Sequence, residues 1–200
     1  RLPTKHRTKW RTGFTVSDSS TQRILATLDK YLSSEIDLVV YGKSALHLLF
    51  EGDRRISLTN DVDLIVPELQ VQVFDKRIDF WDALEKTNQD LEKSSLYLTH
   101  IFDEKQIILH PSWYSNKVKI QTDELNYLNI FVPSPMDLIL TKMMRVDPLD
   151  RSDIVFIFEN AEIKSQELRS YCIEAVCPDQ AEIRDAFENN KVWLREQGMI

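Results

Sequence analysis

The sequence predicts an α/β (α+β) fold in which a mixed sheet is flanked by helices and followed by a C-terminal helical tail. Two short runs rich in β-branched residues, Ile36–Tyr41 and Asp61–Val66, are typical of buried strands. Around them, apolar residues recur at spacings of three and four, which is the period of a helix. Strand patterns stop near residue 133, and only helical periodicity continues from there.

The composition excludes several classes of protein. The chain has 200 residues, 42% hydrophobic and 28% charged, which excludes a disordered or fibrous protein. Its net charge of −7 argues against a protein that coats nucleic acid, which would need a broad basic face. Residues 1–16 differ, because they hold five Lys or Arg residues and no acidic residue. We interpret them as a solvated N-terminal arm; an arm that contacts the phosphates of a nucleic acid or nucleotide is the alternative.

The chain therefore divides into the basic arm (1–16), a mixed α/β core (17–133) and a helical C-terminal region (134–200). The helices expected in the core cover residues 17–34, 45–51 and 68–93. The remaining strands expected in the core are a hairpin formed by residues 96–102 and 106–109, and a strand region over 125–132. The helices expected in the C-terminal region cover residues 136–145, 150–160, 165–177 and 180–197.

The cysteines and the hydropathy pattern indicate the compartment. Cys172 and Cys177 have no neighbouring histidine that would complete a zinc site, so we expect free thiols in a reducing environment. No apolar run reaches the length of a membrane span, which is about 20 residues. No signal-peptide pattern is visible either. We therefore expect a soluble cytoplasmic protein with no membrane partner.

The strongest functional signal is a glycine turn between a strand and a helix, followed by an aspartate pair that opens the next strand. Alternate side chains of a strand share a face, so Asp61 and Asp63 are expected to point the same way. Such a pair can hold Mg²⁺, which proteins usually bind through one or two carboxylates together with substrate phosphates. The turn at Gly42 opens a helix whose first N–H groups form an anion site. Ser44 can add a hydroxyl donor there, and Lys43 a positive charge.

Each part of this signal is weak when taken alone. Acidic pairs at strand starts are common, and Gly42-Lys43-Ser44 is not a P-loop, because the glycine required five residues earlier is absent. The order of the two parts along the chain is more informative than either part, since it places an anion site close to a cation site.

In this order the residues resemble the nucleotidyltransferase superfamily with the DNA polymerase β-like fold. More narrowly, the chain resembles the nucleotidyltransferase-like family that includes abortive-infection type toxins, because residues 137–142 and 149–154 match its lysine-bearing helix and its Arg/Asp-rich helix start. The resemblance covers about residues 36–160, and it makes 17–133 a nucleotidyltransferase-like core. It implies that Asp61 and Asp63 are catalytic and bind Mg²⁺, with Mn²⁺ as a substitute. The nucleotide-binding residues that it implies are Gly42, Lys43, Ser44, Thr59, Lys142 and Asp153.

Among the departures of the sequence from the pattern of that family, two bear directly on the chemistry. Lys43 stands where a second glycine is usual, and its side chain either helps to bind phosphate or blocks a close approach of the backbone. A third carboxylate on a later strand is not apparent, since Asp103 falls in a predicted turn. His110 ends the strand expected after that turn. It is a candidate for the missing ligand or base, and local hydrogen bonding is the alternative.

Two further pairs of charged residues have competing interpretations. Lys142 and Arg145 are three residues apart on a predicted helix and are expected to share a face. They either bind phosphate or form a solvated basic strip paired with acidic neighbours, Asp147 and Asp150. Asp150 and Asp153 in turn either line the nucleotide site or cap the next helix.

The leading hypothesis is Mg²⁺-dependent transfer of a nucleoside monophosphate from an NTP to an acceptor hydroxyl on RNA, a protein or a small molecule. The resemblance adds a toxin role, with a cognate antitoxin as partner. The missing third carboxylate and Lys43 favour the alternative, a catalytically inactive binding module or antitoxin-like partner protein. A scaffold that does not bind NTP is the third hypothesis.

Overall fold

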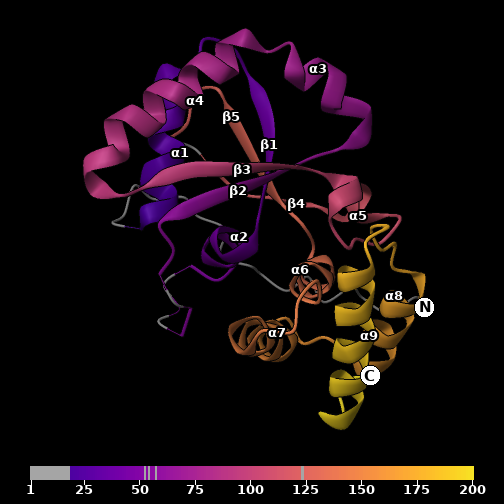
Figure 1. The fold of residues 1–200 in the computed structure, drawn as a ribbon. Coiled ribbons are helices and arrows are strands. Elements are labelled where there is room, and N and C mark those ends of the chain that lie inside the picture. Colours follow the sequence, from indigo (N-terminus) through magenta and orange to yellow (C-terminus); the bar gives the residue numbers. More distant parts are fainter. Residues whose placement is uncertain (1–18, 52, 54, 57, 123) are drawn as a thin grey trace, which may run out of the picture.

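Five strands in the described part of the chain form one mixed sheet (Figure 1). The computed structural model describes residues 19–51, 53, 55–56, 58–122 and 124–200. The strands are β1 (Ile36–Tyr41), β2 (Asp61–Val66), β3 (Tyr97–Asp103), β4 (Val118–Lys119) and β5 (Leu128–Val132). Their order is β3-β2-β1-β5-β4; β1–β2 and β4–β5 are antiparallel, and β1–β5 and β2–β3 are parallel. The predicted mixed sheet is confirmed.

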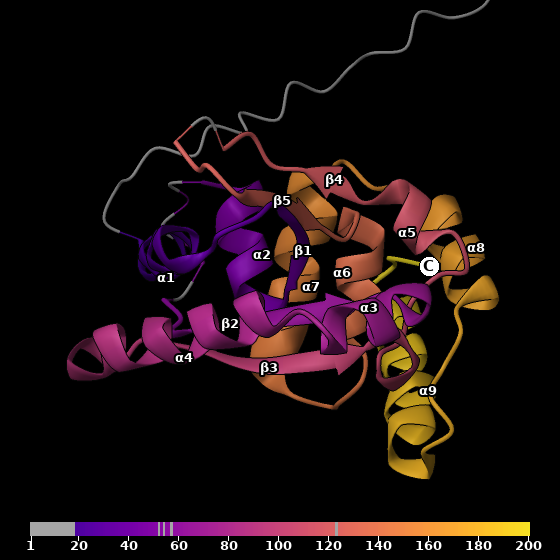
Figure 2. The ribbon, with the colours of Figure 1, turned by 90° about the horizontal axis from the view of Figure 1, so that it is seen from above.

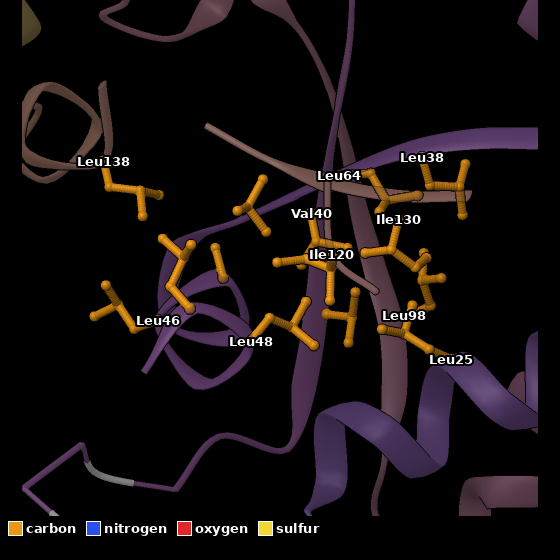
Figure 3. Close-up of a cluster of buried hydrophobic side chains, with 14 of the residues drawn as sticks. Leu25, Leu38, Val40, Leu46, Leu48, Leu64, Leu98, Ile120, Ile130 and Leu138 are labelled. Atoms are coloured by element: carbon orange, nitrogen blue, oxygen red, sulfur yellow. The ribbon is translucent and has the colours of Figure 1, made fainter. Parts of the chain in front are cut away.

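One face of the sheet packs against three helices, α1 (Ser20–Tyr31), α2 (Gly42–Leu49) and α4 (Ile78–Leu91). Figure 2 shows α2 beside β1. Alternate strand residues point into this layer, and they meet apolar residues that the helices present at intervals of three and four. Each fully buried aliphatic side chain contributes about 1.5–3 kcal/mol. Figure 3 shows this cluster; its labelled strand and helix residues include Val40, Leu64, Ile130, Leu25 and Leu46.

The opposite face of the sheet is covered only in part by a second apolar cluster. Val39 of β1 and Ile65 of β2 pack there against Ile107, Leu109 and Trp113, which follow β3. Because side chains alternate along a strand, the residues two and four positions before Ile65 point to this same face. They are the two aspartates of β2, and they lie toward the end of the strand away from Ile65.

Four helices form the C-terminal region, as predicted: α6 (Pro135–Lys142), α7 (Pro148–Asn160), α8 (Ser165–Glu174) and α9 (Ala181–Glu196). A proline stands in the first turn of α6 and of α7, where its missing N–H is not required. Ser134 and Asp147 cap these two helices by accepting hydrogen bonds from backbone N–H groups. All four helices contribute side chains to the large cluster that also contains the sheet residues, and Figure 1 shows them together beside one end of the sheet.

The predicted hairpin is wrong. β3 pairs in parallel with β2, and the residues after it do not return along it. Asp103 instead accepts a hydrogen bond from the N–H of Lys105 and caps a short 3-10 helix, η3 (Glu104–Gln106), which turns the chain out of the sheet. Leu109 then forms an isolated antiparallel bridge with Val176, so the helix predicted over 165–177 ends at Glu174.

The single helix predicted over 68–93 is also wrong, because the chain breaks it into η1 (Glu68–Gln70), α3 (Val71–Asp75) and α4. Phe74 and Phe80 lie on either side of the break, and both are buried with ring centroids 4.6 Å apart. Residues six apart point in different directions on a continuous helix. The turn at Lys76 and Arg77 lets both rings enter the same core.

The other boundaries differ by a few residues. α1 is capped by Ser19, two residues after the predicted start of this helix; residues 17–18 and the arm over residues 1–16 lie outside the described residues. A short helix, α5 (Trp113–Asn116), and the 3-10 turn η2 (Glu92–Ser94) were not predicted. In the described residues, no helix combines the length and the apolar character needed to span a membrane.

Candidate active site

The turn between β1 and α2 lies directly beside the aspartate pair. Gly42 adopts a φ of 69°, in the left-handed region that favours glycine, so α2 begins immediately after the strand. Tyr41 pairs with Asp63 in the antiparallel register of β1 and β2. As a result, a Cβ atom placed on Gly42 would lie 3.7 Å from Asp63 Oδ2.

A cavity of about 720 Å³ opens at this point. Its walls come from the β1–α2 turn, the start of β2, the middle of β3 and the segment from the end of α6 to the start of α7. The predicted site residues that line it are Asp61, Asp63, Gly42, Lys43, Ser44, Thr59 and Lys142. The structure therefore brings residues from four separate segments to one hollow, and it places the two carboxylates on the same face of β2.

Each aspartate carries a hydrogen-bond donor on its Oδ1 oxygen. The hydroxyl of Thr59 donates to Asp61 Oδ1 at 2.5 Å. The hydroxyl of Thr99 donates to Asp63 Oδ1 at 3.1 Å, and His100 Nδ1 lies 3.1 Å from the same oxygen. Thr99 and His100 both face Asp63, because the β2–β3 register shifts at this point and leaves two residues of β3 opposite one residue of β2.

A network of three cations and two carboxylates joins α2, α6 and α7 at the cavity wall. Lys43 Nζ lies 2.7 Å from Asp153 Oδ1, and Lys142 Nζ lies 2.8 Å from Asp153 Oδ2 and 3.0 Å from Asp150 Oδ1. Arg145 Nε donates to Asp150 Oδ2 at 2.5 Å. Burial alone would raise the pKa of Asp150, but the hydrogen bond from Arg145 and the charge of Lys142 outweigh it and lower that pKa. The network keeps one net positive charge next to the aspartate pair.

Three of the predicted nucleotide-binding side chains already have partners inside the protein. The hydroxyl of Ser44 is buried and donates to the backbone carbonyl of Asp61 at 2.5 Å, so its proton is not directed at a phosphate. Thr59 donates to a carboxylate instead. Asp153 is 8% exposed, is not among the residues lining the cavity, and holds Lys43 and Lys142.

The interpretations of the C-terminal charged residues need correction. α6 ends at Lys142, so Arg145 does not share a helical face with it, although both side chains reach Asp150. Lys142 is buried in ion pairs and is not part of a solvated strip. The cap of α7 is Asp147, which accepts hydrogen bonds from the N–H groups of Leu149 and Asp150. Arg145, by contrast, keeps 75% of its side chain exposed at the cavity.

Sequence reasoning missed the residues that β3 contributes. His100 and Phe102 line the cavity, with Phe102 edge-on to Tyr41 at a centroid distance of 5.6 Å. Burial and the charge of Asp63 raise the pKa of the Tyr41 phenol, which keeps it protonated. If the parallel pairing of β2 with β3 had been predicted, these side chains would have been expected beside Asp63. The predicted hairpin instead paired the residues of β3 with the segment that follows them.

His110 lies outside the cavity of the aspartate pair and forms local hydrogen bonds, which was the alternative interpretation of this residue. Its Nδ1 lies 2.7 Å from Ser112 Oγ, its Nε2 lies 3.2 Å from Glu174, and its ring stacks on Tyr171 at 4.0 Å. It is not among the residues that line the cavity of the aspartate pair. The hypothesis that His110 replaces a missing ligand or base is therefore wrong.

Both cysteines are free, as predicted. Burial raises the pKa of Cys172 to about 11, so this thiol stays protonated and unreactive near neutral pH. Cys177 is only partly buried, and its pKa is also raised by burial.

The aspartate pair fits a small hard cation. Within the residues that the structure describes, no three His, Cys, Asp or Glu side chains form a ready-made metal site. Two carboxylates in one cavity beside a helix N-terminus are nevertheless the donor set that Mg²⁺ takes when waters and substrate phosphates complete its coordination. Zinc or calcium would require more ligands from the protein.

Comparison with known proteins places the chain in a family. A family model described as "Nucleotidyltransferase of unknown function (DUF6036)" matches residues 21–175, which include the sheet, the cavity and most of the C-terminal helices. No curated protein and no solved structure matches the chain. The description of the family gives neither a substrate nor a toxin role. The match covers most of the chain, and the chain therefore belongs to this family of nucleotidyltransferases of unknown function.

Proposed function

We propose that this protein is a Mg²⁺-dependent nucleotidyltransferase that moves a nucleoside monophosphate from an NTP to an acceptor hydroxyl. The observation that carries the proposal is a single cavity with opposite charges on its walls. Two carboxylates and a helix N-terminus line this cavity together with three cations, Lys43, Lys142 and Arg145. Family membership supports the reaction class.

The triphosphate would bind at the start of α2. Tyr41, the N-cap residue, makes no side-chain hydrogen bond to the first turn, so the amides of Gly42, Lys43 and Ser44 are open to an anionic ligand. Arg145 supplies an exposed guanidinium that lines the same cavity, and its planar group suits a phosphate. Lys43 adds a second charge at the same turn.

Asp61 and Asp63 would hold the cation. When bound there, Mg²⁺, or Mn²⁺ in its place, neutralises phosphate charge and lowers the pKa of an attacking hydroxyl. The acceptor oxygen forms a bond to the α-phosphorus, the bond from that phosphorus to the bridging oxygen breaks, and pyrophosphate leaves. The hydroxyl proton passes to solvent. Lys43 and Arg145 stabilise the negative charge that grows on the leaving pyrophosphate.

The test is a transfer assay with α-labelled NTPs, Mg²⁺ and three acceptor pools: total RNA, lysate protein and small molecules. Wild type is compared with Asp63→Asn and with Asp37→Asn, a control that removes an exposed charge from β1 outside this cavity. We expect label transfer by wild type and by the control, and loss of at least 100-fold in Asp63→Asn. NTP binding without transfer in all three proteins would instead support an inactive binding module, and no thermal shift with NTP would support a scaffold.

One observation favours the inactive module as the second candidate. Lys43 is paired with Asp153, and Lys142 with Asp150. Apart from Asp61 and Asp63, the acidic residues that line the cavity are Asp147 and Asp150, and both already have partners within the protein. Incubation of each labelled NTP with Mg²⁺ and the acceptor pools separates the two candidates, because an inactive module binds the NTP and leaves it unchanged, whereas the enzyme converts it.

A toxin role follows if the acceptor is a macromolecule that cells need. Expression of wild type would then stop growth, whereas expression of Asp63→Asn would not, and the arrest would be relieved by a neighbouring antitoxin gene. Equal growth of both strains would argue against a toxin.

A further inference from the structure

The Oδ1 oxygens of the two aspartates are occupied in the same way. Thr59 lies two residues before Asp61 and donates to its Oδ1, and Thr99 reaches Asp63 Oδ1 from the neighbouring strand. His100 Nδ1 lies 3.1 Å from that second oxygen as well. Each carboxylate is therefore held at its Oδ1 oxygen by a threonine hydroxyl.

The backbone fixes these threonine–aspartate pairs in place. Ser44 of α2 donates to the carbonyl of Asp61 at 2.5 Å and anchors the start of β2 to the glycine turn. The shift in the β2–β3 register leaves both Thr99 and His100 opposite Asp63, whereas regular pairing would place only one of them there. Asp63 Oδ2 lies on the side of Gly42, where the missing side chain leaves space in the cavity.

We propose that Thr59 and Thr99 are positioning residues that make the aspartate pair selective for Mg²⁺ and Mn²⁺ over Ca²⁺. By donating to Oδ1, each hydroxyl favours binding of the cation through the other oxygen of its carboxylate. Two single oxygens suit a small octahedral ion that keeps several waters, whereas Ca²⁺ takes six to eight oxygens and commonly binds carboxylates through both of theirs. The inference rests on the proposed function, because it assumes that the pair binds a cation.

Hydrogen bonds to ligating carboxylates affect metal affinity strongly, and removing one typically weakens binding about 10–100-fold. We therefore expect Thr59→Val and Thr99→Val each to weaken Mn²⁺ and Mg²⁺ binding about tenfold or more. Ca²⁺ binding should fall less or rise, because the freed oxygen becomes available to it. The Mg²⁺/Ca²⁺ selectivity ratio should therefore fall.

The experiment is a titration with Mn²⁺ alone, followed by the electron paramagnetic resonance signal of free Mn²⁺, with Mg²⁺ and Ca²⁺ as competitors. Thr141→Val is the matched control, since Thr141 lines the same cavity but its hydroxyl donates to the backbone carbonyl of Leu138. Thr59→Ser and Thr99→Ser keep the hydroxyl and should retain wild-type selectivity. Thr99 is exposed, so its variants are expected to fold, and circular dichroism checks this.

Unchanged Mn²⁺ affinity and an unchanged Mg²⁺/Ca²⁺ ratio in both valine variants would overturn the inference. If Asp61→Asn and Asp63→Asn abolish binding in the same series, the proposed function survives that result. If wild type binds no Mn²⁺ at all, the cation site and the proposed function fail together. A serine variant that behaves like its valine counterpart would also contradict the inference, because the loss would then come from packing.

Discussion

Asp137 is a buried carboxylate outside the candidate active site, at the first turn of α6. It accepts hydrogen bonds from the hydroxyls of Ser134 and Tyr171 and from the N–H of His110. Burial raises its pKa, and these hydrogen bonds oppose the rise only in part. Asp137 therefore connects α6 with α8 and with the segment after β3. Because its carboxyl group titrates, the stability of these contacts depends on pH.

A raised pKa fixes the direction of the pH effect. Because the folded protein binds this proton more tightly than the unfolded chain, the stabilisation is complete below the unfolded pKa and is lost as pH rises through the folded pKa. Relative to Asp137→Asn, wild type should gain free energy of unfolding as the pH is lowered from neutral toward the ordinary pKa of an aspartate. Urea unfolding of both proteins over this range measures the gain. Identical pH dependence of the two proteins would contradict the assignment.

Gly42 gives a second prediction at the residue scale. Its φ of 69° is unfavourable for a residue with a side chain, whereas the space around it tolerates a methyl group, with Asp63 Oδ2 at 3.7 Å. Gly42→Ala should therefore lower the free energy of unfolding by about 1–2 kcal/mol from backbone strain alone. Urea unfolding measures this loss; a loss above about 3 kcal/mol would indicate a steric clash that the structure does not show.

At the scale of elements, local patterns predicted strands and helices but not their partners. The strands Ile36–Tyr41 and Asp61–Val66 were predicted because β-branched residues are concentrated in them. The pairing of β3 with β2 was not predicted, because the partner of a strand depends on residues far away in the sequence. The same limit explains the site: the alternation within β2 predicted that Asp61 and Asp63 share a face, whereas Thr99 and His100 required knowledge of the β2–β3 pairing.

The contact between α2 and α7 carries a prediction at this scale. Asp153→Ala removes the carboxylate that holds Lys43 and one of the two that hold Lys142, which leaves poorly solvated positive charge. Loss of one partner from a buried pair typically lowers stability by about 3–5 kcal/mol. The double variant Lys43→Met/Asp153→Leu should recover much of the loss, because neither charge remains. Chemical denaturation measures both variants, and strictly additive effects would contradict a direct coupling.

At the scale of the whole molecule, the sheet and the C-terminal helices share one apolar cluster, and the cavity lies where they meet. The end of the strand patterns and the continuing helical periodicity predicted the change from mixed to helical structure near residue 133. These patterns could not predict that the helical region would supply one wall of the cavity, because that depends on how α6 and α7 pack on α2.

Ligand binding at this junction should stabilise the whole fold. A ligand that binds only the folded state adds about 2.7 kcal/mol at 100 times its Kd. NTP with Mg²⁺ should therefore raise the Tm of wild type by several degrees and raise that of Asp61→Asn much less. Differential scanning calorimetry measures both shifts. Equal shifts in the two proteins would place the nucleotide away from the aspartate pair.

The most direct test of the central claim is a crystal structure with Mn²⁺ and a non-hydrolysable NTP, recorded at a wavelength where manganese scatters anomalously. We expect an anomalous peak within bonding distance of Asp61 and Asp63 and phosphate oxygens at the first turn of α2. A peak bound by other residues, or a triphosphate that lies away from Gly42, would contradict the account.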